Sequence, residues 1–351
     1  MDYALILSCF INQKQKLRKF RNKDYLKFIL IIFLLFSIYK IYVFRKLILY
    51  NDKNKNKNKI KSNNQNYLLK QKNIKVCLCT VGKQENKYIR EFVQHYEKYG
   101  INKIILYDNN DKDGEKFEEV IKDYIDKGFV QINNWRGIKQ PDIRTLRDCY
   151  MNNNQSYDWL IFYDIDEYIY LKNITDIREF LNSHKFIHCD KIYLNWVMHT
   201  DNNLLKYDNR SLHERFPVFK PLKKNKKYII SGKSIIRGGI KNIHIKEVHY
   251  LDKKIRSCDS KGKIINFRKI KQIYDLDSEN YFIDHYYFKS LEEFIQKIKK
   301  GDTYFGHNKI FIMHRLKRYF IFNKITLKKI KFLEKNLKVN LSKYKKYLKI
   351  I

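Results

Sequence analysis

The chain has 351 residues, and its 44% hydrophobic content is enough for a globular core and excludes an intrinsically disordered chain. Its 73 Lys and Arg residues against 37 Asp and Glu residues give a formal net charge of +36, which is typical of proteins with an anionic partner. No RNP-type aromatic motif, zinc-finger spacing or helix-turn-helix pattern accompanies this charge. The composition therefore leaves an anionic polymer or membrane surface open as a partner and does not favour nucleic acid.

Near the N-terminus, residues 28–44 read FILIIFLLFSIYKIYVF, an apolar run with a single charge, Lys40, close to its end. The run is near the lower limit of about 17 residues for a membrane span, and it has no polar face to show to water as a buried surface helix would. We therefore expect a cytosolic tail at 1–27, a transmembrane anchor at 28–44 and a polar stalk at 45–73. A buried helix is the alternative.

Basic residues flank both ends of this run, so the positive-inside rule hardly decides its orientation. A short tail, one anchor and a long C-terminal domain are typical of a type II single-pass protein, with the domain in the lumen of the Golgi or another secretory compartment. In such a lumen, two of the three cysteines Cys149, Cys189 and Cys258 are able to pair, whereas Cys77 and Cys79 are expected to act as small hydrophobic residues of a strand.

Four alternating strand and helix patterns follow the stalk. The apolar strands are expected at 74–80, 104–107, 129–132 and 159–163, and amphipathic helices separate them, two of which end at Gly100 and Gly128. Such alternation predicts an α/β fold with a largely parallel sheet that is covered on both faces. Ligands of this architecture bind at the carboxyl ends of the strands.

Beyond residue 167 the pattern changes to a mixed sheet with inserted loops. We expect a strand at 191–196, a hairpin around 229–237 and a strand that ends at His249. Ser290 and Glu293 form the sequence pattern of a capping box, which predicts a helix that Gly301 ends. From residue 315 onward the chain reads as a basic helical tail.

The segment 158–167, DWLIFYDIDE, is the clearest sign of chemistry, because an apolar strand leads directly into three acidic residues. Residues two apart in an extended chain lie on the same side, so Asp164 and Asp166 are expected to converge on one cation, while Glu167 faces elsewhere. Oxygen ligands favour Mn²⁺ or Mg²⁺ over zinc. The alternatives are a helix cap or a salt-bridged turn. Two further Asp-x-Asp pairs, at 111/113 and 275/277, lack such a strand before them.

The order of several short motifs resembles glycosyltransferase family 92 and its relatives in the family 2 superfamily. These motifs are YDNN, DWLIFYDIDEYI, the segment around Trp196, KSIIRGG with HIKEVHY, and HYYFKSLEEFIQKIKKG, and together they run from about Lys75 to Gly301. The resemblance implies a GT-A fold over 74–314, in which a nucleotide-binding half precedes an acceptor-binding half. It also implies a nucleotide-sugar donor, manganese (or magnesium) at the DxD, and inverting transfer to a glycan. We expect a UDP-sugar, with UDP-galactose first.

The same resemblance implies roles for individual residues. Asp164 is expected to help hold the ribose and the metal, Asp166 to bind the metal directly, and His249 to be the third ligand, with His285 as the other candidate. Residues at the ends of the first two strands are expected to contact the nucleoside, and these are Thr80, Glu85, Asp108 and Asn109.

An inverting transfer also needs a base that deprotonates the acceptor hydroxyl. Glu214 is the first candidate and Asp201 the second, since both flank the loop that is expected to cover the acceptor. Four basic residues are expected near the diphosphate, namely Lys233, Arg237, Lys289 and Lys297. A non-catalytic, membrane-tethered binder of an anionic polymer or glycan is the main alternative function. A metal-dependent phosphohydrolase or nuclease is a further one, although it would need more clustered acids or histidines.

Overall fold

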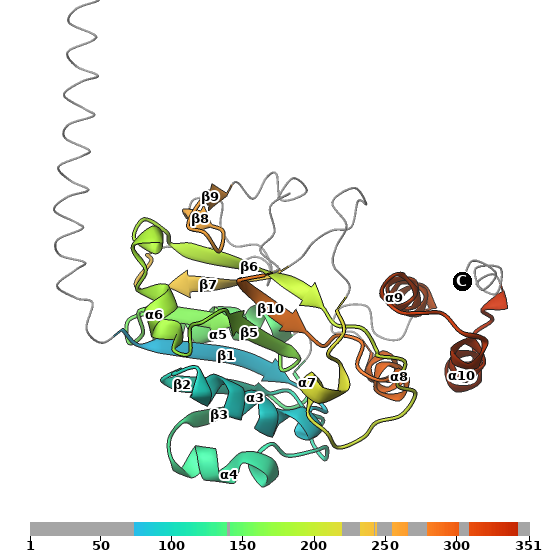
Figure 1. The fold of residues 1–351 in the computed structure, drawn as a ribbon. Helices are drawn as coiled ribbons and strands as arrows, with labels where there is room; N and C mark the ends of the chain where they lie inside the picture. The colour runs from blue at the N-terminus through green and yellow to red at the C-terminus, as the bar shows by residue number, and fades with distance from the viewer. Residues whose placement is uncertain are drawn as a thin grey trace, which may run out of the picture. The chain divides into compact units, whose positions relative to one another are not determined.

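The structure is a computed structural model, and it describes residues 74–138, 141–219, 232–241, 243, 255–265, 279–301 and 309–342 (Figure 1). The expected tail, anchor and stalk at 1–73 and the candidate ligand His249 lie outside these residues. Within the described ranges, no helix has both the length and the apolar character that a membrane span requires.

One mixed sheet forms the centre of the domain, with the strand order β3-β2-β1-β4-β7-β6-β10-β5. The strands on this path are β1 (Val76–Gly82), β2 (Lys103–Asp108), β3 (Val130–Asn134), β4 (Trp159–Phe162), β5 (Glu167–Leu171), β6 (Lys191–Met198), β7 (Gly232–Arg237) and β10 (Tyr281–His285). The first four in this order are parallel, β7 runs antiparallel to both β4 and β6, and β10 is parallel to β6 and antiparallel to β5. Two short strands, β8 (Ser257–Cys258) and β9 (Ile264–Ile265), extend β6.

Helices cover both faces of the parallel part. Along β1, Val76 and Leu78 pack in one cluster with residues of α3 (Asn86–Lys98) and α4 (Glu118–Asp126). The alternate residues, Cys77 and Cys79, pack on the opposite face with residues of α5 (Pro141–Asn153). Burial on both faces explains why β1 reads as a continuous apolar run in the sequence rather than as an alternating pattern.

The remaining helices are α6 (Ile177–Leu181), the 3₁₀-helix η2 (His184–Phe186), α7 (Leu212–Arg215), α8 (Leu291–Lys300), α9 (Lys309–Phe322) and α10 (Leu327–Leu337). Ser290 caps α8 in a full capping box with Glu293, and Gly301 follows it with a φ of 86°, as the sequence predicted. The expected boundary at residue 315 falls inside α9. Leu316 and Tyr319 of α9 and Leu333 of α10 are buried in the main core, so these helices belong to the domain.

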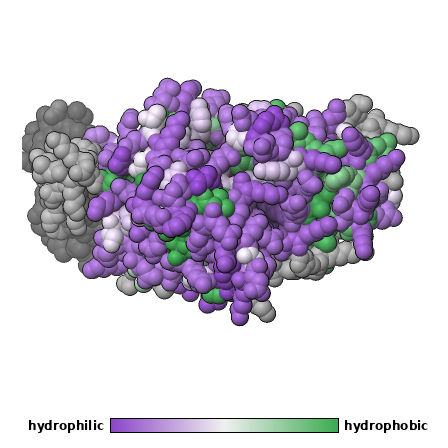
Figure 2. Space-filling model, turned by 90° about the horizontal axis from the view of Figure 1, so that it is seen from below, coloured by the Kyte–Doolittle hydropathy of each residue, from purple (hydrophilic) through white to green (hydrophobic). Residues whose placement is uncertain are grey.

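The expected α/β alternation is present from β1 to β4. Of the expected hairpin around 229–237, only β7 lies within the described residues. Both edges of β7 are already paired, one with β4 and the other with β6, so β7 lies inside the sheet. Hydrophilic residues dominate the face of the molecule in Figure 2, and the described residues expose large hydrophobic side chains at only a few places, such as Ile310 and Met151.

Two disulfides cross-link the domain. Cys189 is bonded to Cys258, and these are two of the three cysteines that were expected to supply a pair. Cys79 is bonded to Cys149, which joins β1 to α5 and corrects the expectation that Cys79 is only a small hydrophobic residue. Cys77 is a buried free thiol, and burial raises its pKa to about 12.

Candidate functional site

The end of β4 directs the two carboxylates of the DxD segment to the carboxyl edge of the sheet. Ile165, between them, is 2% exposed and packs at Gly82, the last residue of β1. A Cβ at Gly82 would lie 2.5 Å from the Ile165 Cδ1 atom, so only glycine leaves room for this side chain. The core thus holds the middle residue of the motif. Its neighbours differ in exposure, at 48% for the Asp164 side chain and 8% for that of Asp166.

Asp166 is surrounded by basic groups. The Lys297 Nζ atom lies 2.6 Å from its Oδ2 atom, and the His285 Nε2 atom lies 3.5 Å from its Oδ1 atom. Its backbone carbonyl accepts a hydrogen bond from the Tyr286 amide at 2.9 Å, which ties β10 to the motif. Burial by itself would raise the pKa of Asp166, but the charge of Lys297 and the contact with the His285 ring outweigh it and lower that pKa well below its usual value. The carboxylate is therefore ionised.

Asp164 has a lysine partner of its own. The Lys233 Nζ atom donates to the Asp164 Oδ2 atom at 2.9 Å and lies 3.6 Å from the Glu167 Oε2 atom. Burial raises the pKa of Glu167 well above its usual value, in spite of Lys233, and so favours its neutral form. Lys233 therefore forms its ion pair mainly with Asp164. Glu167 accepts a hydrogen bond from the Asp164 amide at 2.9 Å and so supports the turn.

His285 is the imidazole that the structure brings to the motif. Burial lowers its pKa to about 4, so the ring is neutral near pH 7 and is able to act as a ligand. Its Nδ1 atom has no hydrogen-bond partner among the described residues, and the ring packs on Trp196 with 4.5 Å between centroids. The only described groups of three potential ligand atoms within 4.8 Å of one another contain disulfide cysteines. Asp164, Asp166 and His285 would therefore have to draw closer to share one ion.

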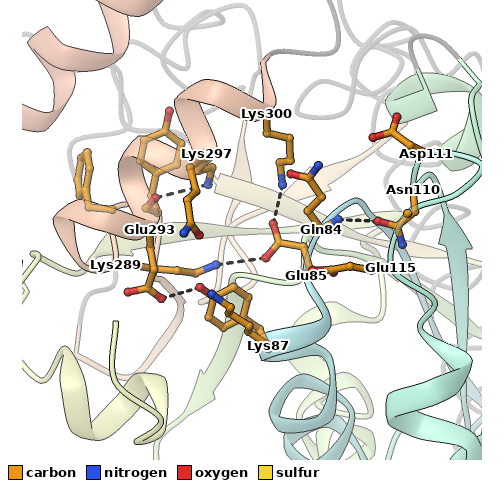
Figure 3. Close-up of a pocket in the computed structure, with 15 residues that line it drawn as sticks. Gln84, Glu85, Lys87, Asn110, Asp111, Glu115, Lys289, Glu293, Lys297 and Lys300 are labelled. Carbon is orange, nitrogen blue, oxygen red and sulfur yellow. Dashed lines mark hydrogen bonds and ion pairs between the residues drawn. The ribbon is translucent and has the colours of Figure 1, made fainter. Parts of the chain in front are cut away.

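A pocket of about 420 Å³ lies beside this motif, between the loops after β1 and β2 and helix α8 (Figure 3). Glu85 is at its centre, with its carboxylate between two lysines of the α8 region. The Lys289 Nζ atom is 3.3 Å from one carboxylate oxygen, and the Lys300 Nζ atom is 2.8 Å from the other. Burial opposes the ionised form of Glu85, but these lysines prevail and lower its pKa. Lys297 also lines the pocket, so it connects the pocket to Asp166.

The other residues that were expected at the nucleoside are buried and do not belong to the lining of the pocket. Asp108 is 1% exposed, accepts hydrogen bonds from Asn110 and forms an ion pair with Arg136 at 2.6 Å. Asn109 donates to the carbonyl groups of Trp135 and Ile138. Thr80 is 4% exposed.

Most of the lining residues were not among the expected site residues, and Asn110 and Lys300 are two of them. The sequence held a signal for both. Asn110 directly follows Asn109 at the end of a predicted strand, and Lys300 lies one helical turn after Lys297.

Neither expected base lines the pocket. Glu214 is exposed, and its carboxylate accepts hydrogen bonds from Ser211 in the capping box of α7. Asp201 is 1% exposed and bound to Lys329 at 2.6 Å. Two of the basic residues that were expected at the diphosphate, Lys233 and Arg237, do not line the pocket either. Lys233 is paired with Asp164, and Arg237 lies over the ring of Trp159 and donates to backbone carbonyl groups.

The sequence profile of glycosyltransferase family 92 matches residues 72–320. A family 92 protein of Ricinus communis is 26% identical over 106 residues, and one of Oryza sativa subsp. japonica is 24% identical over 111 residues. These matches cover 30% and 31% of this chain, and 19% and 18% of the relatives. The matched region is therefore less than a fifth of the length of either relative.

Among solved structures, S. aureus TarS matches with a TM-score of 0.31 and 12% identity, over 70% of this chain and 43% of that chain. Its fragment 1-349 in complex with UDP-GlcNAc matches with a TM-score of 0.26 and 16% identity, over 36% of this chain and 34% of that chain. The family assignment rests on the sequence profile, which matches more than two thirds of the residues. The chain belongs to glycosyltransferase family 92.

Proposed function

We propose that the protein transfers a sugar from a nucleotide diphosphate sugar to a glycan acceptor, with inversion at the sugar and with a divalent metal ion at the DxD motif. A UDP-sugar is the proposed donor, and UDP-galactose is the first to test. The observation that carries the proposal is the contact between pocket and motif. Lys297 lines the pocket and lies 2.6 Å from Asp166, so a diphosphate that binds Lys297 in the pocket would lie close to the Asp166 carboxylate.

The residues at the motif fit Mn²⁺ or Mg²⁺. Asp164 and Asp166 supply carboxylate oxygens, and His285 supplies a neutral imidazole whose Nδ1 atom has no partner in the described part of the chain. We propose Asp164, Asp166 and His285 as the ligands, while His249 remains the other candidate for the third position. When bound, the ion supplies positive charge that stabilises the departing diphosphate.

The chain's own cations add to this stabilisation. Lys289 and Lys300 hold Glu85 at the centre of the pocket, and both present ammonium groups to whatever enters it. Positive groups that are already in place when the leaving group gains charge lower the barrier without a cost for reorganisation. For the base we retain Glu214, since its carboxylate is accessible and that of Asp201 is not.

We further propose that the domain is lumenal and that residues 28–44 anchor it as a type II membrane protein of the Golgi or another secretory compartment. Two disulfides, Cys79–Cys149 and Cys189–Cys258, support an oxidising environment for the folded domain.

The test is a donor screen with the full chain in detergent. Hydrolysis and transfer are measured with several nucleotide sugars, first with EDTA and then with added Mn²⁺. We expect turnover with one UDP-sugar that depends on Mn²⁺. Asp166→Asn should reduce turnover by at least about a hundredfold, because a metal-bound leaving group contributes several kcal/mol to the transition state. The matched control is Asp113→Asn, an exposed residue of another Asp-x-Asp pair. Full activity in Asp166→Asn with an intact fold would contradict the metal assignment.

A further inference from the structure

Lys297 has an unusual position, because it belongs to the pocket and to the motif at once. Its Nζ atom donates to the Asp166 Oδ2 atom at 2.6 Å, and it also lies 4.1 Å from the centre of the Tyr287 ring. Its side chain is 22% exposed, whereas that of Asp166 is only 8% exposed. The ammonium group therefore covers the carboxylate from the side of the pocket.

The other lysines of the pocket have different interaction partners. Lys289 and Lys300 share Glu85, and Lys87 lies 4.5 Å from the centre of the Tyr207 ring. Within the described ranges, none of these three lysines forms an ion pair with Asp166. Among the pocket lysines that Figure 3 shows, Lys297 is the one that pairs with the carboxylate of a proposed metal ligand.

A metal ion and an ammonium group compete for this carboxylate. The metal has to approach Asp166 directly, and the ammonium group already lies within hydrogen-bond distance of one of its two oxygens. Two cations on one buried carboxylate repel each other strongly, because the surroundings screen their charges poorly. Lys297 therefore needs another anion when the metal arrives, and a diphosphate in the pocket would be such an anion.

We propose that Lys297 is a positioning residue that couples metal binding to donor binding. Without donor it neutralises Asp166 and opposes the metal; with donor it moves from Asp166 to the diphosphate. This inference rests on the proposed function. It predicts that metal and nucleotide each strengthen the binding of the other, and that Lys297 supplies part of this coupling, since linkage is reciprocal.

The experiment measures Mn²⁺ binding by the electron paramagnetic resonance signal of the free ion, with the full chain in detergent, with and without UDP. The wild type should bind Mn²⁺ weakly alone and at least about tenfold more tightly with saturating UDP, within the usual range of coupling. Lys297→Met should bind Mn²⁺ alone about tenfold more tightly than the wild type, because the competing charge is gone. The same variant should bind UDP more weakly in the presence of Mn²⁺, and its coupling should shrink.

Two further variants control for side effects. Lys297→Arg keeps the charge and should keep weak binding of Mn²⁺ alone. Lys299→Met removes an exposed lysine of the same helix and should behave as the wild type. Circular dichroism melting checks that each variant is folded.

The outcomes distinguish the coupling role of Lys297 from the proposed metal-dependent function. If UDP and Mn²⁺ bind the wild type but Lys297→Met binds Mn²⁺ alone no more tightly, the coupling role is overturned and the proposed function stands. If neither the wild type nor any variant binds Mn²⁺, even with UDP present, the metal in the proposed function fails as well. Opposite changes in the affinities for Mn²⁺ and UDP are the signature of the coupling, which a merely structural role of Lys297 would not produce.

Discussion

Lys329 and Asp201 form a buried ion pair, with 2.6 Å between the Nζ and Oδ2 atoms and with each side chain 2% exposed. The pair joins α10 to the loop after β6. The hydroxyl group of Tyr319 donates to the same carboxylate, and the Asn323 side chain accepts a hydrogen bond from the Asp201 amide. The contacts of Asp201 thus fasten the two C-terminal helices to the domain, and they leave its carboxylate little access to an acceptor.

We predict that Asp201→Asn acts on stability and not on the chemical step. Loss of one partner of a buried ion pair leaves the other charge uncompensated, so the free energy of unfolding should fall by about 3–5 kcal/mol. Urea denaturation measures this change, and transfer assays at low temperature measure kcat per folded molecule. Lys329→Met should cause a similar loss. A kcat lowered by about 10²–10⁴-fold in Asp201→Asn at unchanged stability would instead identify Asp201 as the base.

The sequence was sufficient to predict the first half of the sheet, because the parallel strands β1, β2 and β4 are buried on both faces and read as apolar runs. It was insufficient for β5 and β10, which are short and pair with each other across more than a hundred residues of chain. The environment of His285 depends on this long-range pairing, as β10 brings it to Asp166. No local pattern reveals such a contact, so the choice between His285 and His249 could not be made from the chain alone.

This choice gives a second prediction. His285→Gln should weaken Mn²⁺ binding in the presence of UDP by about 10–100-fold or more, since removal of a ligand should cost at least as much as loss of a supporting partner. Free Mn²⁺ measured by electron paramagnetic resonance gives the affinity. His249→Gln, made in parallel, should leave the affinity unchanged. The reverse pattern would assign the third ligand to His249.

The ends of the predicted strands indicated where the pocket lies, but not which residues line it. Side chains after β1 and β2 do meet near one pocket, but which of them line it depends on side-chain direction. Asp108 turns toward Asn110 and Arg136 and is buried, whereas Glu85, further along its loop, lines the pocket. The sequence predicts the edge of the sheet at which polar groups gather. The hydrogen bonds within each turn decide which of these groups remain available to a ligand.

His95 gives a third prediction, on pH. Its ring is half-buried beside α3 and its Nε2 atom donates to the Ile169 carbonyl at 3.0 Å, and desolvation lowers its pKa from 6.5 to about 4. The unfolded chain therefore takes up this proton more readily than the folded one as the pH falls below 6.5. The contribution of the neutral His95 ring to the free energy of unfolding is fully present above that pH. About 3 kcal/mol of this free energy is lost between pH 7 and pH 4.

The matched variant is His95→Gln, which keeps a donor for the Ile169 carbonyl and does not titrate. Urea denaturation at several pH values should show that the wild type loses about 3 kcal/mol more than this variant between pH 7 and pH 4. Equal losses in the two proteins would mean that His95 becomes protonated in the folded state without cost.

The last prediction concerns Asn173 and tests the lumenal orientation. Residues 173–175, Asn-Ile-Thr, form a glycosylation sequon in the turn after β5, where Asn173 is exposed and has a φ of 59°. Asn154 also begins a sequon, but its side-chain amide donates to the carbonyl groups of Tyr150 and Met151 at the end of α5. We therefore expect a glycan on Asn173 and none on Asn154 when the full chain is made in a eukaryotic secretory system.

Two variants of the full chain separate these sites. In each, three of the four sequon asparagines, which are Asn154, Asn173, Asn209 and Asn340, are changed to Gln. The variant that keeps Asn173 should show a shift in electrophoretic mobility that glycosidase removes, and the variant that keeps Asn154 should show none. The wild type carries all the sequons, so the absence of any glycan on it would contradict a lumenal domain. A glycan on the Asn154 variant but not on the Asn173 variant would keep the orientation and refute the argument from exposure.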